Sequence, residues 1–236
     1  MNKLVVALLS SAALLLTVAA GSAADLPARP VYKAPMAVPA FSWTGIYIGG
    51  NVGYGWGRTR GTAATSAAGG QPGQFDLDGI VGGGQIGANY QIANWVLGVE
   101  VDYQGASIDG SGTGGAFTDS AKIERFGTAR GRIGYAWDRW MVYGTGGYAF
   151  GARTNYTFVT PALGSGSRDL DGWVAGGGIE YAFAPNWSAK VEYLHLDLDR
   201  KSFGSLGCAP AACTVGAELD TVRFGINYRF SGLGWR

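Results

Sequence analysis

Apolar and polar residues alternate with a period of two along most of the chain after residue 43. In the segment 95–105, the residues on one face are Trp95, Leu97, Val99, Val101 and Tyr103. A period of two predicts strands, because successive side chains of an extended chain point to opposite faces. The pattern predicts eight strands, at about 44–57, 78–91, 95–105, 122–137, 140–152, 172–183, 187–198 and 219–230.

The connections between these segments alternate between short and long. The short ones cover 92–94, 138–139 and 184–186, and the long ones cover 58–77, 106–121, 153–171 and 199–218. Short turns at one end and long loops at the other are typical of outer-membrane β-barrels. Aromatic residues border each short turn, as Tyr90 and Trp95 do, and such residues mark the membrane–water interface in these barrels.

Alternation alone does not decide whether the apolar face points into a core or into lipid, and a soluble up-and-down barrel has the same period. The polar face consists mostly of glycine, serine, asparagine and glutamine. A soluble surface normally carries more lysine and glutamate. The mature chain has no long apolar run, so a membrane location requires a closed barrel of strands. We therefore predict an all-β, eight-stranded antiparallel up-and-down transmembrane β-barrel.

The first 24 residues have the pattern of an export signal. Lys3 gives the positive start, residues 4–20 are apolar, and small residues precede a cleavage site after Ala24. Residues 25–42 hold four of the eight prolines, which favours an extended periplasmic leader. The predicted organisation is a signal peptide at 1–24, a Pro-rich leader at 25–42 and an outer-membrane barrel at 43–236.

Composition excludes two classes of binding site. Glycine accounts for 41 of the 236 residues, so the G-x-G-x-x-G spacing of Gly82, Gly84 and Gly87 arises without a nucleotide site. Only residues 92–94 separate the second predicted strand from the third, which leaves no room for the crossover helix of a dinucleotide fold. The formal net charge of +1 gives no electrostatic case for binding nucleic acid.

Four stretches of the sequence resemble the outer-membrane immunogenic protein family. They are FSWTGIYIGGNVGYGWG, ERFGTARGRIGYAWDRWMVYGTGGYAFG, GWVAGGGIEYAFAPNWSAKVEYLHLDL and DTVRFGINYRF. The family consists of small surface barrels akin to the opacity-type proteins, and some members are described as hemin-binding or porin-like. The resemblance implies an eight-stranded barrel in the outer membrane, with a periplasmic N-terminus and four long extracellular loops. Such chains commonly end on the aromatic that closes the last strand, here Phe230, whereas this chain continues with SGLGWR.

Charged residues on the polar face share one phase, so we expect them to point at the barrel axis. They are Glu100, Asp102, Lys122, Glu124, Arg130, Arg132, Glu180, Lys190, Glu192, Arg223 and Arg229. Side chains nearly fill an eight-stranded barrel, so these charges are expected to pair and brace its wall. A selectivity-lined pore is the alternative, and it would make the protein a small porin-like channel.

The sequence contains no recognisable catalytic constellation. Its single histidine, His195, falls on the lipid-facing phase without a serine in phase beside it, so a hydrolase triad is not predicted. We expect no enzyme activity, no metal site and no resident cofactor. Hemin binding is an alternative implied by the family resemblance, with His195 or Tyr156 of the third loop as the iron ligand.

The two cysteines, Cys208 and Cys213, lie close together in an exported chain, which predicts a disulfide within the fourth loop. The expected partners are outer-membrane lipid with lipopolysaccharide, and the outer-membrane assembly machinery. Hemin and a host-surface ligand are alternatives that the sequence leaves open. The expected function is a structural and surface-interaction role in the Gram-negative cell envelope, as a surface antigen without catalysis.

Overall fold

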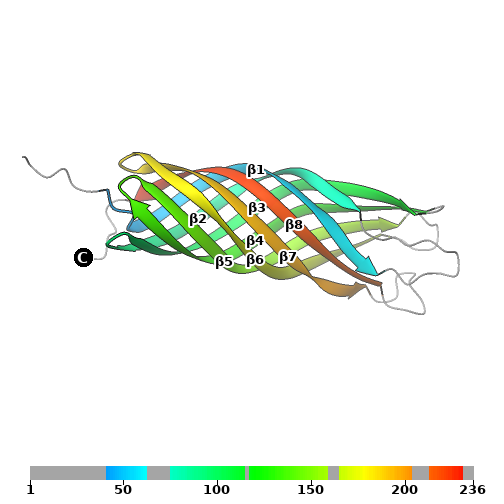
Figure 1. Ribbon diagram of the computed structural model, residues 1–236. Helices are drawn as coiled ribbons and strands as arrows, with labels where there is room; N and C mark the ends of the chain where they lie inside the picture. The colour runs from blue at the N-terminus through cyan, green and yellow to red at the C-terminus, as the bar shows by residue number, and fades with distance from the viewer. Residues whose placement is uncertain (1–40, 63–74, 115–116, 159–164, 204–212, 231–236) are drawn as a thin grey trace, which may run out of the picture. The chain divides into compact units, whose positions relative to one another are not determined.

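The computed structural model describes residues 41–62, 75–114, 117–158, 165–203 and 213–230 (Figure 1). Within these ranges, eight strands form one closed antiparallel barrel, in which each strand pairs with its neighbours in sequence and β8 pairs with β1. The strands are β1 Gly45–Thr62, β2 Asp76–Ile92, β3 Trp95–Gly114, β4 Phe117–Trp137, β5 Trp140–Phe158, β6 Ser165–Ala184, β7 Trp187–Phe203 and β8 Cys213–Phe230. The predicted fold is confirmed. The predicted signal peptide and residues 25–40 of the predicted leader fall outside the described ranges, and no described segment is a helix able to cross a membrane.

The strands extend further toward the loop end than the sequence pattern predicts. Most of the predicted second loop is strand, because β3 and β4 stay paired as far as Gly114 and Phe117 and leave only residues 115–116 between them. Tyr156 lies in β5, opposite Ala121 and Gly166, and not in the third loop as predicted. Both predictions are wrong for one reason. Near the loop end the apolar side chains lie on the inner face instead of the outer face. A strand recognised by its outward apolar residues is therefore predicted to end before the real strand does.

β-Bulges explain where two of the predicted inward charges lie. The pairing of β4 with β5 shifts register between Ile123 and Arg125 and again between Arg125 and Gly127. An extra residue in a strand turns the side chains beyond it to the opposite face. Ile123 is therefore buried, whereas Lys122 and Glu124 are exposed on the outside although they share the sequence phase of Arg130. The prediction that these two charges point inward is wrong.

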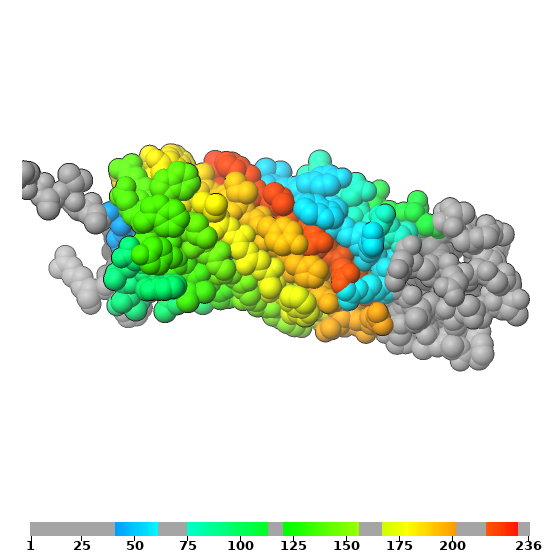
Figure 2. All heavy atoms as spheres, in the orientation of Figure 1, coloured from blue at the N-terminus to red at the C-terminus, as the bar shows by residue number. Residues whose placement is uncertain are grey.

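The outer face of the barrel carries aromatic side chains at two levels, and apart from Phe224 the large residues between them are aliphatic (Figure 2 shows one side of this surface). Near the short turns the exposed aromatics are Tyr90, Trp95, Tyr135, Trp137, Trp140, Tyr181, Phe183, Trp187 and Phe230. Toward the loops they are Tyr54, Trp56, Tyr103, Tyr148, Trp173 and Tyr193. Two aromatic belts that border an apolar band are the lipid-facing surface of an outer-membrane barrel.

Candidate functional site in the barrel interior

The interior of the barrel changes its chemistry along the axis, and β4 passes through all three levels. Ala136 belongs to an apolar cluster near the short turns, Arg130 and Arg132 lie in the middle, and Phe126 belongs to an apolar cluster on the loop side. We call these levels the short-turn layer, the charged layer and the loop-side layer. The short-turn layer consists of Trp43, Val96, Ala136, Met141, Tyr143 and Ala182. The loop-side layer includes Leu77, Val81, Ile108, Ile123, Phe126, Leu170, Val174, Leu194, Leu196, Leu198 and Leu219.

The charged layer brings together eight of the residues predicted to point at the axis, all of them buried. They are Glu100, Asp102, Arg130, Arg132, Glu180, Lys190, Glu192 and Arg223. Arg130 is at the centre: its guanidinium lies 2.5 Å from Glu100, 2.8 Å from Asp102 and 3.1 Å from Glu192. These residues come from β3, β4 and β7, so the ion pairs connect strands that lie on different sides of the barrel.

The other cations extend this network around the axis. Arg223 of β8 contacts Glu192 at 2.6 Å and Asp102 at 3.2 Å. Lys190 of β7 contacts Glu100 at 2.9 Å. On the short-turn side, Arg132 contacts Glu180 at 2.8 Å. The four cations and four carboxylates of the layer balance in charge, which is the condition under which buried ions are tolerated.

Neutral donors complete the coordination of the carboxylates. The hydroxyl of Tyr47 donates to Glu100 over 2.7 Å, and that of Tyr143 donates to Glu192 over 2.9 Å. Ser188 and Asn227 both donate to Glu180, and Thr128 donates to Asp102. Each carboxylate of the layer thus accepts bonds from neutral as well as charged groups, whereas Nε of Arg130, Arg132 and Arg223 is buried without a hydrogen-bond partner among the described residues.

Glycine makes room for the long side chains of this layer. Gly53 of β1 pairs with Arg223 of β8, and a Cβ at Gly53 would lie 2.9 Å from Cγ of Arg223. Gly178 of β6 pairs with Tyr143, and a Cβ there would lie 2.8 Å from the phenol oxygen. A side chain at either glycine would displace a member of the network. Glycine on one strand is therefore the counterpart of a large residue on the next, which accounts for glycine on the polar face.

Besides Lys122 and Glu124, Arg229 is the third of the predicted inward charges that lies outside the charged layer. It lies half-buried at the short-turn end, donates to the Pro185 carbonyl over 2.7 Å and holds its guanidinium 4.2 Å from the centre of the Phe41 ring. No ion pair joins it to a carboxylate of the described residues. It sits at the short-turn end of β8, where its charge interacts with Glu180 without a direct ion pair, so Arg229 lies beside the charged layer and not among its ion pairs.

The sequence pattern missed the loop-side layer, although a signal for it exists. Leucine stands between acidic residues in the triplets 76–78, 169–171, 197–199 and 218–220. Each of these leucines is buried, whereas the flanking acidic residues lie on the outer surface or near it. Several of the acidic residues pair there with cations, as Asp76 does with Arg58 at 3.0 Å and Asp171 with Lys201 at 2.7 Å. In β2, β6, β7 and β8, a leucine between two acidic residues thus marks the part of the strand where the apolar side chains point inward.

His195 lies on the outer face, as its phase predicts. Its Nδ1 is 2.8 Å from Oδ1 of Asp220, which also accepts a 2.6 Å hydrogen bond from Tyr193, and its ring lies 5.4 Å from that of Trp173. The side chain of Tyr156 and the residue Cys208 fall outside the described part of the chain, so the predicted disulfide between Cys208 and Cys213 stays a prediction.

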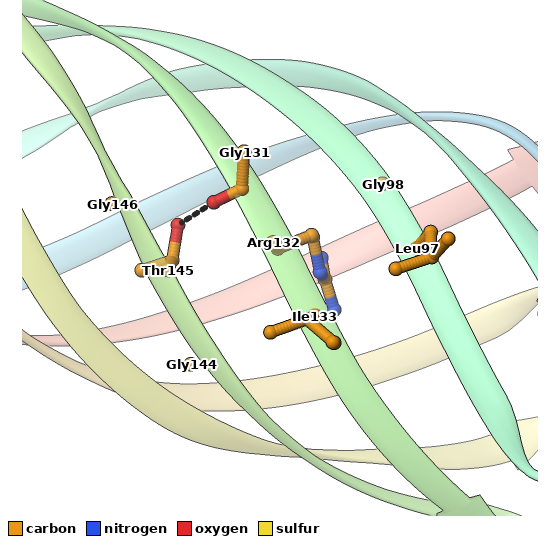
Figure 3. A pocket seen from close by; sticks show the side chains of 8 residues that line it. All are labelled: Leu97, Gly98, Gly131, Arg132, Ile133, Gly144, Thr145 and Gly146. Carbon is orange, nitrogen blue, oxygen red and sulfur yellow. Dashed lines mark hydrogen bonds between the residues drawn. The ribbon is translucent and has the colours of Figure 1, made fainter.

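A hollow of about 540 Å³ opens on the outer face over β3, β4 and β5 (Figure 3). Gly131, Gly144 and Gly146 leave the backbone bare there, and Thr145 donates a 2.9 Å hydrogen bond to the Gly131 carbonyl. Arg132 lines the hollow only with its base, because its side chain is buried in the charged layer. Without convergent polar groups the hollow lacks the features of a specific ligand site.

Comparison with known proteins places this architecture in a family. The family model of the outer membrane protein beta-barrel domain matches residues 10–230. The 31 kDa outer-membrane immunogenic protein of Brucella melitensis biotype 1 is 40% identical over 215 residues, which cover 84% of this chain and 89% of that protein. A 22 kDa outer membrane protein of Rhizobium leguminosarum bv. viciae is 29% identical, over 81% of this chain and 80% of that protein.

Among solved structures, Neisserial surface protein A matches with a TM-score of 0.45 and 12% identity, over 79% of this chain and 98% of that one. The family match spans all eight strands of the barrel described above. The chain therefore belongs to the family of outer membrane proteins with a β-barrel domain, and the Brucella outer-membrane immunogenic proteins are among its relatives.

Proposed function

We propose that this protein is a closed, non-catalytic barrel that braces the outer membrane and presents its loops on the cell surface. In this proposal the short turns and the N-terminus lie in the periplasm and the longer connections lie outside the cell. Lipid and lipopolysaccharide surround the aromatic belts, and the outer-membrane assembly machinery inserts the chain. The surface role rests on the family, whose curated members include outer-membrane immunogenic proteins.

The observation that carries the proposal is the filled interior. The charged layer pairs its ions across the axis, and apolar layers lie on either side of it. A conducting pore needs a continuous water column, whereas the loop-side layer packs leucine, isoleucine and phenylalanine side chains that are fully buried. Ion pairs and an apolar layer in series favour a scaffold over a channel.

Planar-bilayer recording tests this proposal. We expect the unmodified protein to give at most small, flickering conductance, whereas a general porin reconstituted in the same lipid serves as the positive control. Large, steady, ion-selective steps from the unmodified protein would contradict the closed scaffold and identify a small porin-like channel instead.

Hemin binding is a second candidate, and one local arrangement favours it. Asp220 fixes the imidazole of His195 through Nδ1, and the side chain of His195 stays 32% exposed on the outer face beside Trp173. A carboxylate on one ring nitrogen orients the ring and directs the other nitrogen toward a metal. The aromatic neighbour offers a surface against which a porphyrin can stack.

Hemin titration in detergent separates this site from nonspecific partitioning. If His195 is an iron ligand, the unmodified protein shows a saturable absorbance shift that His195→Ala abolishes and Asp220→Asn weakens. Trp95→Ala, which removes an exposed aromatic far along the surface, serves as the control. A shift that is the same in all of these proteins would exclude His195 as the ligand.

A further inference from the structure

The chain enters the barrel through its short-turn mouth. Residues 41–44 precede β1, and Trp43 is only 2% exposed because it packs in the short-turn layer with Val96 and Met141. The chain then turns into β1 at Gly45, whose φ of 141° is a conformation that glycine adopts without strain. We call residues 41–44 the mouth segment. Its first two residues, Phe41 and Ser42, belong to the segment that the sequence predicts as the leader.

Side chains, and not the strand ladder, hold the mouth segment in place. The Trp43 amide donates to Oε1 of Gln91 over 2.7 Å, and the Gln91 amide donates to the hydroxyl of Thr44 over 3.0 Å. Ladder pairing of β1 begins only at Gly45 with β2 and at Ile46 with β8. Because the segment contributes no ladder bond of its own, it is able to leave the mouth while the barrel stays closed.

Arg229 ties the mouth segment to the rim. Its guanidinium covers the ring of Phe41 at 4.2 Å and donates both to the Ser42 carbonyl and to the Pro185 carbonyl in the turn between β6 and β7. The Phe41 ring meets the Trp43 ring edge-on at 5.1 Å. These contacts with the mouth segment explain why the guanidinium of Arg229 makes no ion pair in the charged layer.

The packing around Trp43 is incomplete. The indole Nε1 of Trp43 and Oδ1 of Asn89 are buried without a hydrogen-bond partner among the described residues. Both residues line a space of about 10 Å³ beside Tyr47 and Ser188, which is room for roughly one water molecule. Neither atom has a protein partner in the inserted position, so hydrogen bonding to the protein does not hold the indole there.

We propose that the mouth segment is a removable cork, in which Trp43 seals the charged layer from the short-turn side and Arg229 is the latch. This inference rests on the closed barrel proposed above and adds a moving part to it. The chain continues from Phe41 directly into the Pro-rich leader, so a force or partner that acts on the leader acts on the cork. Withdrawal of Trp43 opens the mouth as far as Glu180 and Ser188, while the loop-side layer stays closed.

Thiol accessibility tests the cork. Ser188, which is 8% exposed and lines the space beside Trp43, is replaced by cysteine in the full chain that also carries Cys208→Ser and Cys213→Ser. A polar, membrane-impermeant thiol reagent is then added to the protein in detergent. We expect slow labelling with the cork intact and labelling faster by on the order of tenfold or more in Trp43→Ala, because local opening then no longer limits access.

The latch and the controls use further variants. Arg229→Gln retains Trp43 but loses the cation over Phe41, so we expect an intermediate labelling rate. Trp95→Ala removes an exposed tryptophan at the same end and should leave the rate unchanged. Gel mobility before and after boiling shows whether each variant is a folded barrel. If Trp43→Ala does not fold, the labelling rate of the double variant Arg229→Gln, Phe41→Leu is compared with that of the parent instead.

Fast labelling in the parent, or equal rates in the parent and all cork and latch variants, would overturn the cork. That result is distinct from failure of the closed-barrel proposal, which is read from steady conductance of the unmodified protein. A barrel that conducts little but is labelled fast keeps the scaffold and loses the cork.

Discussion

The two halves of the barrel are built by opposite rules from the same eight strands. In the half near the short turns, aliphatic and aromatic side chains cover the outside, and the inside holds the charged layer with the small short-turn layer at its end. In the half near the loops, leucine and isoleucine fill the inside and ion pairs such as Arg58–Asp76 and Lys201–Asp171 lie on the outside. The first half follows the rules of a membrane barrel and the second those of a soluble one, so the change of polarity marks where the protein leaves the lipid.

The largest effect in this comparison is expected in the charged layer. Arg130→Met leaves Glu100, Asp102 and Glu192 without their central cation. We expect it to lower the free energy of unfolding by about 3–5 kcal/mol, because the remaining charges are buried and uncompensated. Urea unfolding in liposomes, followed by gel mobility, measures the change. A loss no larger than that of an exposed cation would show that the layer is hydrated and not paired.

The loop-side layer should respond to loss of volume and not to loss of charge. Leu219→Ala removes a fully buried side chain between Glu218 and Asp220. The expected loss of unfolding free energy is about 2–5 kcal/mol, as for truncation in a soluble core. Glu218→Gln on the outer surface of the same strand is the matched control, with little expected change. If Leu219→Ala is neutral, the layer is not a packed core.

Two outward positions on β3 compare the surfaces of the halves directly. Val99 is 62% exposed in the apolar band, and Ser107 is exposed on the same strand nearer the loops. Val99→Arg should cost about 2–4 kcal/mol of folding free energy in lipid, since a cation there faces hydrocarbon. Ser107→Arg should be close to neutral because it faces water or lipid headgroups. Equal costs at the two positions would contradict the boundary between the halves.

The smallest effect is expected from the outer ion pairs. Arg58 and Asp76 lie 3.0 Å apart, but both side chains are largely exposed. Arg58→Ala should change the free energy of unfolding by about 0–1 kcal/mol, with any effect weakened by added salt. A salt-independent loss as large as that of Arg130→Met would show that this surface is as desolvated as the interior.

The sequence predicts the membrane half well and the loop-side half poorly. The number of strands, their order and the inward phase of Glu100, Arg132 and Arg223 follow from alternation, because a regular strand keeps its phase. Phase is lost at bulges, and so Lys122 and Glu124 were assigned to the wrong face. The three-layered interior was not predicted, because alternation assigns faces but does not tell which inward residues meet across the axis.

The loop-side half of the barrel also sets the distance between the loops and the membrane. From Trp173 in the outer aromatic belt to the start of β6 at Ser165, the strand continues for eight residues. At about 3.3 Å per residue and the tilt usual in barrels, this corresponds to roughly 20 Å along the axis. In the proposed orientation the paired strands form a stiff pedestal that lifts the loops clear of the lipid headgroups. A reagent directed at the loops would therefore bind above the headgroups, with no need to reach the bilayer itself.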